Sequence, residues 1–146
     1  MIDPRPGNEK NEELSNREAR DPMNQLLAIA AGGAVGSVLR FLTSTWVHSF
    51  AGRDFPYGTL TVNVLGSLMM GFLFVLFLDR LTDNAMLRAG ILIGALGGFT
   101  TFSSFSIETF NLIEQGAVLK AVLNMAGSLM LCVGATWIGV IIGRQV

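Results

Sequence analysis

A short segment of the chain combines residue types that are unusual within an apolar stretch: Gly97-Gly98-Phe99-Thr100-Thr101-Phe102-Ser103-Ser104-Phe105-Ser106. Two adjacent glycines weaken a helix, and five hydroxyl side chains follow them within seven residues. Backbone groups released inside a membrane are tolerated only where they are buried in protein or face a cavity. The segment therefore predicts a helix break at residues 97–101, whose free carbonyls could coordinate a hard cation. A kinked helix whose hydroxyls bond to the preceding turn is the alternative interpretation.

Three phenylalanines at a spacing of three residues, Phe99, Phe102 and Phe105, lie among these hydroxyls. The edge of an aromatic ring carries partial positive charge. Ring edges beside the hydroxyl donors of Ser103 and Ser104 could stabilise a small dehydrated anion. The alternative for such a stripe is ordinary apolar packing.

Polar side chains spaced by four residues occur on two further stretches: Thr59, Asn63 and Ser67, and then Lys120, Asn124 and Ser128. This spacing places each set on one face of a helix. An Asn within a membrane is costly unless its amide is bonded, so we expect Asn63 and Asn124 to face the bundle interior. A hydrogen bond between helices, with no role toward an ion, is the alternative for both.

Two ionisable residues need an explanation: Arg40 lies inside the first apolar stretch, toward its far end, and Glu108 closes the third. Arg40 could hold a structural contact or attract anions to a vestibule, and Glu108 could gate or mark the membrane boundary. The sequence shows no Ser–His–Asp set, no His and Cys metal cluster and no phosphate-binding loop. We therefore predict that the protein is not an enzyme. No broad basic surface suits a nucleic acid.

The elements that must position these residues follow from charge and length. Only 14% of the 146 residues are charged, and the first 23 residues contain ten of the 21 acidic and basic side chains. Because a spanning helix needs about 20 mainly apolar residues, the rest of the chain predicts four. We predict an all-α, multi-pass protein of the plasma (inner) membrane with four transmembrane helices, at about residues 24–50, 57–78, 86–111 and 117–143.

Residues 1–22 mix Pro, Asn, Glu and Arg and contain few large apolar side chains. This composition predicts a disordered charged tail, separate from a channel domain at residues 23–146. The tail is either a dispensable extension or a stretch upstream of a translation start at Met23.

Glycine pairs at a spacing of four residues recur in the predicted spans, at positions 32 and 36, 90 and 94, 94 and 98, and 139 and 143. Small residues at this spacing allow helix backbones to approach closely in lipid. Four spans enclose little interior, so an ion pathway is expected to need a second subunit. Apart from the tail, the basic residues differ little between the two sides, three against two, which permits insertion in both orientations.

Four motifs in order resemble the CrcB/Fluc family of fluoride channels and cover the chain from Met23 onward: Gly32-Gly33-Ala34-Val35-Gly36-Ser37-Val38-Leu39-Arg40, Gly58-Thr59-Leu60-Thr61-Val62-Asn63, the segment 97–106, and Asn124-Met125-Ala126-Gly127-Ser128. The resemblance implies a passive channel that exports fluoride from the cytoplasm and so prevents its toxicity. It also implies an antiparallel, dual-topology homodimer with a broken third helix, two pores and one structural sodium ion at the dimer interface.

The resemblance assigns roles residue by residue. Backbone carbonyls of Gly97 and Thr100 would hold sodium, whereas Arg40 and Glu108 match a vestibule or structural arginine and an acidic position. The anion pathway would be formed by seven residues: Asn63, Phe102, Phe105, Ser103, Ser104, Asn124 and Ser128. Ser104 stands where the family often has Thr, and the long tail has no counterpart in the family pattern.

Two other functions remain open from the residues. A small four-helix, proton-coupled multidrug transporter would need a carboxylate deep in the first span, where the sequence has Arg40 instead. A membrane assembly subunit without transport activity would explain the packing glycines but not the hydroxyl and phenylalanine cluster.

Overall fold

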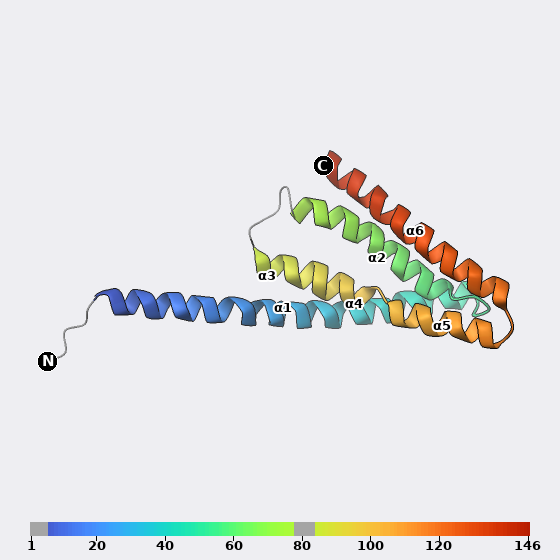
Figure 1. Ribbon diagram of the computed structural model, residues 1–146, viewed down its shortest axis with the longest axis horizontal. Helices are drawn as coiled ribbons and strands as arrows, with labels where there is room; N and C mark the ends of the chain where they lie inside the picture. The colour runs from blue at the N-terminus through green and yellow to red at the C-terminus, as the bar shows by residue number, and fades with distance from the viewer. Residues whose placement is uncertain (1–5, 78–83) are drawn as a thin grey trace.

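The chain folds into helices joined by short connections (Figure 1). The structure is a computed structural model that describes the backbone of residues 6–77 and 84–146 and the side chains of residues 22–77 and 84–146. The elements in order are α1 (Pro6–Ala51), α2 (Tyr57–Leu76), α3 (Ala85–Arg88), the π-helix η2 (Ala89–Leu96), α4 (Gly97–Phe99), α5 (Phe102–Glu114) and α6 (Val118–Gln145). Within these described residues there is no strand, so the all-α prediction is confirmed.

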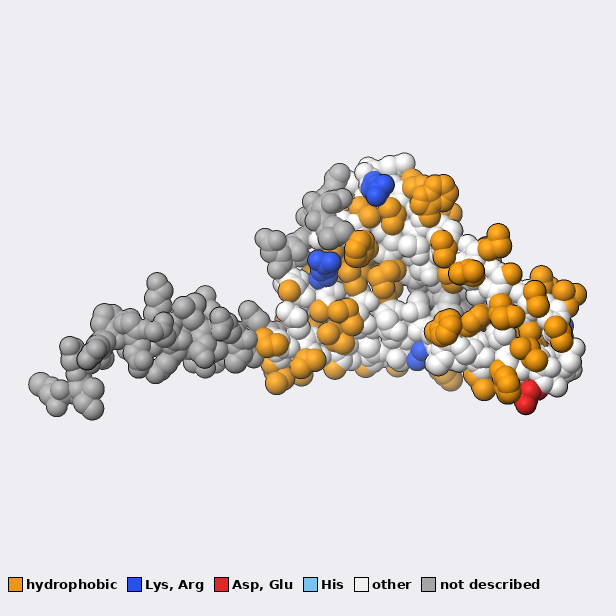
Figure 2. Space-filling model, viewed as in Figure 1, with side chains coloured by type: hydrophobic (Ala, Val, Ile, Leu, Met, Phe, Trp, Pro, Cys, Tyr) orange, Lys and Arg blue, Asp and Glu red, His pale blue; other side chains and the backbone are white. Residues whose placement is uncertain are grey.

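Four helical stretches are long and apolar enough to cross a membrane: Pro22–Ala51, Tyr57–Leu76, Ala85–Glu114 and Val118–Gln145. The predicted number of spans is confirmed. Many large hydrophobic side chains on these stretches are exposed, such as Phe41, Trp46 and Trp137. On the face drawn in Figure 2, hydrophobic side chains are spread along the bundle and charged ones appear at few places. An apolar exterior of this extent is stable in lipid and not in water.

The N-terminal stretch differs from the sequence prediction. Residues 1–22 were expected to be disordered, but α1 begins at Pro6, so its helical backbone covers residues 6–22. The physical reason lies in composition. Glu, Lys, Arg and Leu are good helix formers, which offsets part of the cost of Pro22, a proline inside α1 that has no N–H for a helical hydrogen bond. Pro6 is well placed at the first helical position, where its missing N–H has no intrahelical partner to lose. Residues 1–5 lie outside the described part.

The four spans run alternately up and down, so both chain ends lie at the same end of the bundle (Figure 1). Helix α1 packs along η2 and α4, and α2 packs along α6. The third span, from α3 to α5, is therefore held against α1 by its first half. Its second half, α5, contacts α6 and α2.

Glycines form the close contacts between these helices, as their spacing predicted. A Cβ added at Gly98 would lie 2.7 Å from the carbonyl oxygen of Gly33 on α1, and one at Gly94 would lie 2.7 Å from that of Ile29. On the other pair of helices, a Cβ at Gly139 would collide with the Leu68 carbonyl oxygen. Backbone therefore packs on backbone along both crossings, which leaves no room for a larger side chain.

The third span changes conformation between α4 and α5. Thr100 has φ −81° and ψ 156°, and Thr101 has φ −152° and ψ 115°, so both residues are extended. Upstream, η2 is a π-helix, whose wider turns release a backbone group from the usual ladder. Extended residues between two helices expose backbone N–H and C=O groups that need partners.

Candidate functional site

The side chain of Asn63 from α2 reaches the extended segment. Its Oδ1 accepts a hydrogen bond from the Thr101 N–H at 2.7 Å, and its Nδ2 donates to the Thr101 carbonyl oxygen at 3.1 Å. Both backbone groups of Thr101 are thus bonded by one amide. This contact is a hydrogen bond between helical segments, which is the alternative that the sequence left open for Asn63.

The carbonyls of Gly97 and Thr100 lose the donors that a continuous helix would give them. The N–H four residues after Gly97 belongs to Thr101 and donates to Asn63, and the N–H four residues after Thr100 belongs to Ser104 and donates to the Thr101 hydroxyl at 3.2 Å. The Thr100 carbonyl oxygen has a long contact of 3.4 Å with Arg40 Nη1. These two carbonyls are the pair that the family resemblance assigns to a cation.

The hydroxyls of the segment serve mainly to stabilise the start of α5. Thr101 Oγ1 accepts the Ser104 N–H as an N-cap and lies 3.1 Å from Ser104 Oγ and 3.2 Å from Ser103 Oγ. Ser106 Oγ donates to the Phe102 carbonyl oxygen. Ser103 and Ser104 therefore form local hydrogen bonds. Local bonding of the hydroxyls is also part of the alternative interpretation, in which the third span is a kinked helix.

A cavity of about 610 Å³ lies beside the extended segment, between α2, α5 and α6. Asn63, Phe102, Phe105 and Ser128 line it, so the fold brings together four of the seven residues expected in the anion pathway. Of the described residues around this cavity, none is charged. The rings of Phe102 and Phe105 lie 5.3 Å apart at an interplanar angle of 43°, and the Phe102 side chain is 79% exposed. Ser128 Oγ is buried and has no hydrogen-bond partner among the described residues.

Asn124, the other predicted asparagine, lies inside the bundle. It is 1% exposed, and its Nδ2 donates to Thr109 Oγ1 at 2.8 Å. Thr109 in turn donates to the Phe105 carbonyl oxygen at 2.7 Å. The structure does not place Asn124 on the wall of the cavity beside the segment, and its contact is a hydrogen bond between α6 and α5.

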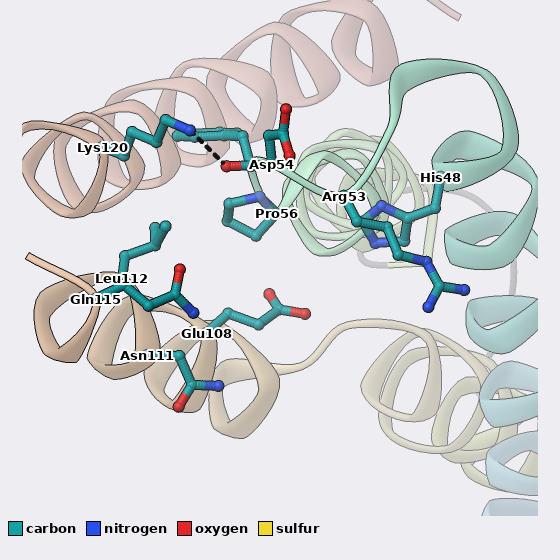
Figure 3. A pocket seen from close by; sticks show the side chains of 10 residues that line it. His48, Arg53, Asp54, Pro56, Glu108, Asn111, Leu112, Gln115 and Lys120 are labelled. Carbon is teal, nitrogen blue, oxygen red and sulfur yellow. Dashed lines mark hydrogen bonds between the residues drawn. The ribbon is translucent and has the colours of Figure 1, made fainter. Parts of the chain in front are cut away.

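A second cavity, also of about 610 Å³, lies at the end of the bundle where α1 and α5 finish and α2 and α6 begin (Figure 3). Glu108 and Asn111 project from α5, and the Lys120 ammonium donates to the Asp54 carbonyl oxygen at 3.1 Å. Glu108 Oε1 accepts from Thr59 Oγ1 at 2.8 Å, and Oε2 is buried with no partner among the described residues. This cavity is polar and charged, unlike the cavity beside the segment.

The sequence pattern missed two threonine partners. Thr109 has no place in the spacing patterns, yet it joins Asn124 to α5. Thr59 belonged to the polar face with Asn63, but its partner Glu108 could not be identified because 49 residues separate them. Over the described part of the chain, no group of His, Cys, Asp and Glu side chains is placed to hold a metal ion.

Comparison of the sequence with known proteins identifies its family. The model of a family described as "CrcB-like protein, Camphor Resistance (CrcB)" matches residues 27–140. The chain belongs to the CrcB family. The match contains all the residues of both cavities and excludes the N-terminal tail. All four motifs on which the resemblance was based are inside it, so that resemblance is confirmed.

Curated relatives of this CrcB protein carry the name "Fluoride-specific ion channel FluC". One from Magnetococcus marinus is 48% identical over 122 residues, which are 84% of this chain and 99% of the relative. One from Coxiella burnetii is 53% identical over 124 residues, with the same coverage of both chains. One from Methylococcus capsulatus is 49% identical over 120 residues, or 82% of this chain, and the chain spans only 53% of its length.

Proposed function

We propose that the protein is a fluoride-selective passive channel that exports fluoride from the cytoplasm. The observation that carries this proposal is an uncharged cavity whose wall combines an amide, a buried hydroxyl and two phenyl rings, in a chain whose relatives are named fluoride-specific channels. Fluoride is small and strongly hydrated, so its passage needs donors that replace water without trapping the ion. Ion channels are not enzymes, and we propose no catalytic residues.

The proposed anion pathway runs along the cavity beside the extended segment. Phe102 and Phe105 would present ring edges, and Ser128 would offer a hydroxyl whose hydrogen is uncommitted. Ser103, Ser104 and Asn124 would act mainly through the hydrogen bonds that fix α5. Arg40, which contacts the Thr100 carbonyl oxygen, and Glu108, which lines the polar cavity, would contribute charge near the path.

We further propose that the functional unit is an antiparallel, dual-topology homodimer in the plasma (inner) membrane. The cavity beside the segment opens on the surface of one protomer, where Phe102 is exposed. A second copy would close this opening and exclude lipid from the pathway. The weak asymmetry of basic residues supports insertion in both orientations.

The break in the third span is proposed to hold a structural sodium ion at the dimer interface. The carbonyls of Gly97 and Thr100 would supply its ligands, since both have lost their helical donors. The ion would add a fixed positive charge to the centre of the dimer.

Ion efflux from liposomes tests the proposed function. Vesicles containing purified protein and loaded with fluoride are expected to release it when a potassium ionophore supplies the countercharge, without ATP and without a proton gradient. Vesicles loaded with chloride are the matched control and are expected to retain their anion. Folded, reconstituted protein that releases no fluoride would refute the proposal. Efflux that requires a proton gradient would instead favour a coupled transporter.

A further inference from the structure

The single histidine of the chain, His48, lies near the end of α1 and lines the polar cavity (Figure 3). Its Nδ1 is 3.0 Å from the Gly52 carbonyl oxygen. Because a carbonyl oxygen can only accept a hydrogen bond, Nδ1 carries the hydrogen of the neutral imidazole. Nε2 is therefore the nitrogen that takes up a proton when the ring becomes charged.

The first turn of α2 brings His48 and Glu108 to adjacent residues. A Cβ added at Gly58 would lie 2.7 Å from His48 Nε2, so the imidazole rests against the backbone of Gly58. The next residue, Thr59, donates to Glu108 Oε1 at 2.8 Å. Since consecutive Cα atoms are about 3.8 Å apart, Nε2 and the carboxylate approach the same short stretch of α2. Figure 3 shows the Glu108 side chain directed from α5 into the cavity that His48 also lines.

The Glu108 carboxylate lacks a partner for one of its oxygens. Oε1 accepts from Thr59, whereas Oε2 is buried and has no partner among the described residues. A buried carboxylate oxygen without a donor is costly, and it favours the approach of a positive group. The protonated ring of His48 carries an N–H and a positive charge at Nε2. The neutral ring has only a lone pair there, which cannot bond a carboxylate.

The other charged side chains that line the polar cavity, among the described residues, are Arg53, Asp54 and Lys120. Arg53 and Asp54 lie between α1 and α2, and their opposite charges act on His48 in opposite directions. Lys120 projects from α6, and its ammonium bonds the Asp54 carbonyl oxygen. With Glu108 ionised, two cationic and two anionic side chains balance one another. A proton on His48 therefore gives this lining a net positive charge.

The polar cavity adjoins the proposed anion pathway. On α5, Phe105 lines the cavity beside the extended segment, and Glu108, three residues later, lines the polar cavity. Residues three apart are neighbours on one face of a helix. Charge in the polar cavity consequently acts on an anion that enters or leaves the pathway at this end of the bundle.

We infer that His48 is a proton-binding residue, paired with Glu108, that makes anion conduction through this protein depend on pH. Protonation directs an N–H toward the Glu108 carboxylate and gives the polar cavity a net positive charge, which attracts anions. Imidazole takes up a proton between about pH 5 and 8, so conduction increases as the pH falls through this range. That the anion is fluoride rests on the proposed function. The pair of side chains does not, and it can be measured without any transport.

The pair is tested by NMR on tag-free, full-length protein in fluoride-free buffer. Because the chain has one histidine, its imidazole nitrogen resonances report His48 alone. Glu108→Gln removes the negative charge but keeps an oxygen that can accept from Thr59. We expect the affinity of His48 for its proton to fall at least about threefold in this variant.

Glu114→Gln is the matched control, because Glu114 is an exposed carboxylate of the same helix that lines neither cavity. Its His48 titration should match the wild type. A titration that is the same in the Glu108 and Glu114 variants would overturn the pair. If Glu108→Gln fails to fold, the distance between His48 Nε2 and Glu108 Cδ, measured by solid-state NMR in the wild type, decides: shortening on acidification supports the pair, and an unchanged distance overturns it.

Fluoride current in a planar bilayer tests the effect on conduction, because neutral HF carries no current. We expect the wild-type current to be at least about twofold larger near pH 6 than near pH 8. His48→Gln keeps an N–H for the Gly52 oxygen but cannot become charged, and we expect it to lose this difference. An equal pH dependence in the two proteins would overturn the role of His48. A wild type without fluoride current, whose His48 titration still responds to Glu108→Gln, would refute the proposed function alone.

Discussion

At the scale of single residues, most polar groups of the segment between α4 and α5 bond to other parts of the protein. Asn63 and Thr101 pair with each other, and the serines at the start of α5 bond to the Thr101 hydroxyl. Ser128 differs, because its buried hydroxyl has no partner among the described residues. The two phenyl rings share the rest of the cavity wall with aliphatic and sulfur-containing side chains, such as Met70, Met125 and Leu129.

Replacing Phe102 tests the proposed contribution of a ring edge. Phe102→Ile keeps an apolar side chain but removes the polarised edge, and we expect fluoride flux into or out of liposomes to fall at least about tenfold. Its side chain is 79% exposed, so the protomer should still fold. Phe110→Ile is the matched control, since Phe110 is an exposed ring of the same helix that lines neither cavity. Equal flux in the two variants would contradict the pore assignment of Phe102.

The buried contact between Asn124 and Thr109 is expected to stabilise the packing of α6 on α5. In a double-mutant cycle of Asn124→Leu and Thr109→Val, we expect a coupling energy of about 0.5–2 kcal/mol. The free energy of unfolding in detergent provides the measurement. Additive effects of the two substitutions would show that this hydrogen bond contributes no stability. The reason for expecting coupling is that Asn124 is 1% exposed and no water can replace Thr109.

At the scale of elements, the crossing between α1 and the third span determines where the extended segment lies. Gly98→Ala would place a Cβ 2.7 Å from the Gly33 oxygen and 3.0 Å from its Cα, and backbone cannot move aside as a side chain can. We expect destabilisation of about 1–3 kcal/mol and lower thermal resistance in detergent. Gly127→Ala is the control, because a Cβ there meets nothing within 4 Å. If both variants melt like the wild type, this crossing is not close-packed.

The sequence predicts the features that depend on residues close together in the chain, and it does not predict contacts between residues far apart. The lengths of the apolar runs predict four spans, and glycines four residues apart predict the close crossings, because both patterns are local. The partners of Asn63 and Glu108 could not be predicted, since they depend on how helices far apart in sequence align along their axes. The prediction of disorder at residues 1–22 considered the scarcity of large apolar side chains and not the helix propensity of Glu, Lys, Arg and Leu.

At the scale of the whole molecule, the family match begins at residue 27, so the tail lies outside the matched part of the chain. We expect deletion of residues 2–22 to leave fluoride flux within about twofold of the full-length protein, because both cavities are lined by residues 48–136. Liposome flux and the amount of inserted protein are measured together. Loss of insertion on deletion would show that the tail helps to orient the protein in the membrane, contrary to this expectation.

Passive and selective conduction of fluoride is the central claim, and the reversal potential of the current measures it most directly. Protein in a planar bilayer is exposed to a tenfold fluoride gradient with equal chloride and equal pH on both sides. A fluoride-selective channel predicts a current that reverses about 59 mV from zero, which is the value for a monovalent ion. A reversal near zero, or one that moves with a chloride or proton gradient instead, would contradict the account.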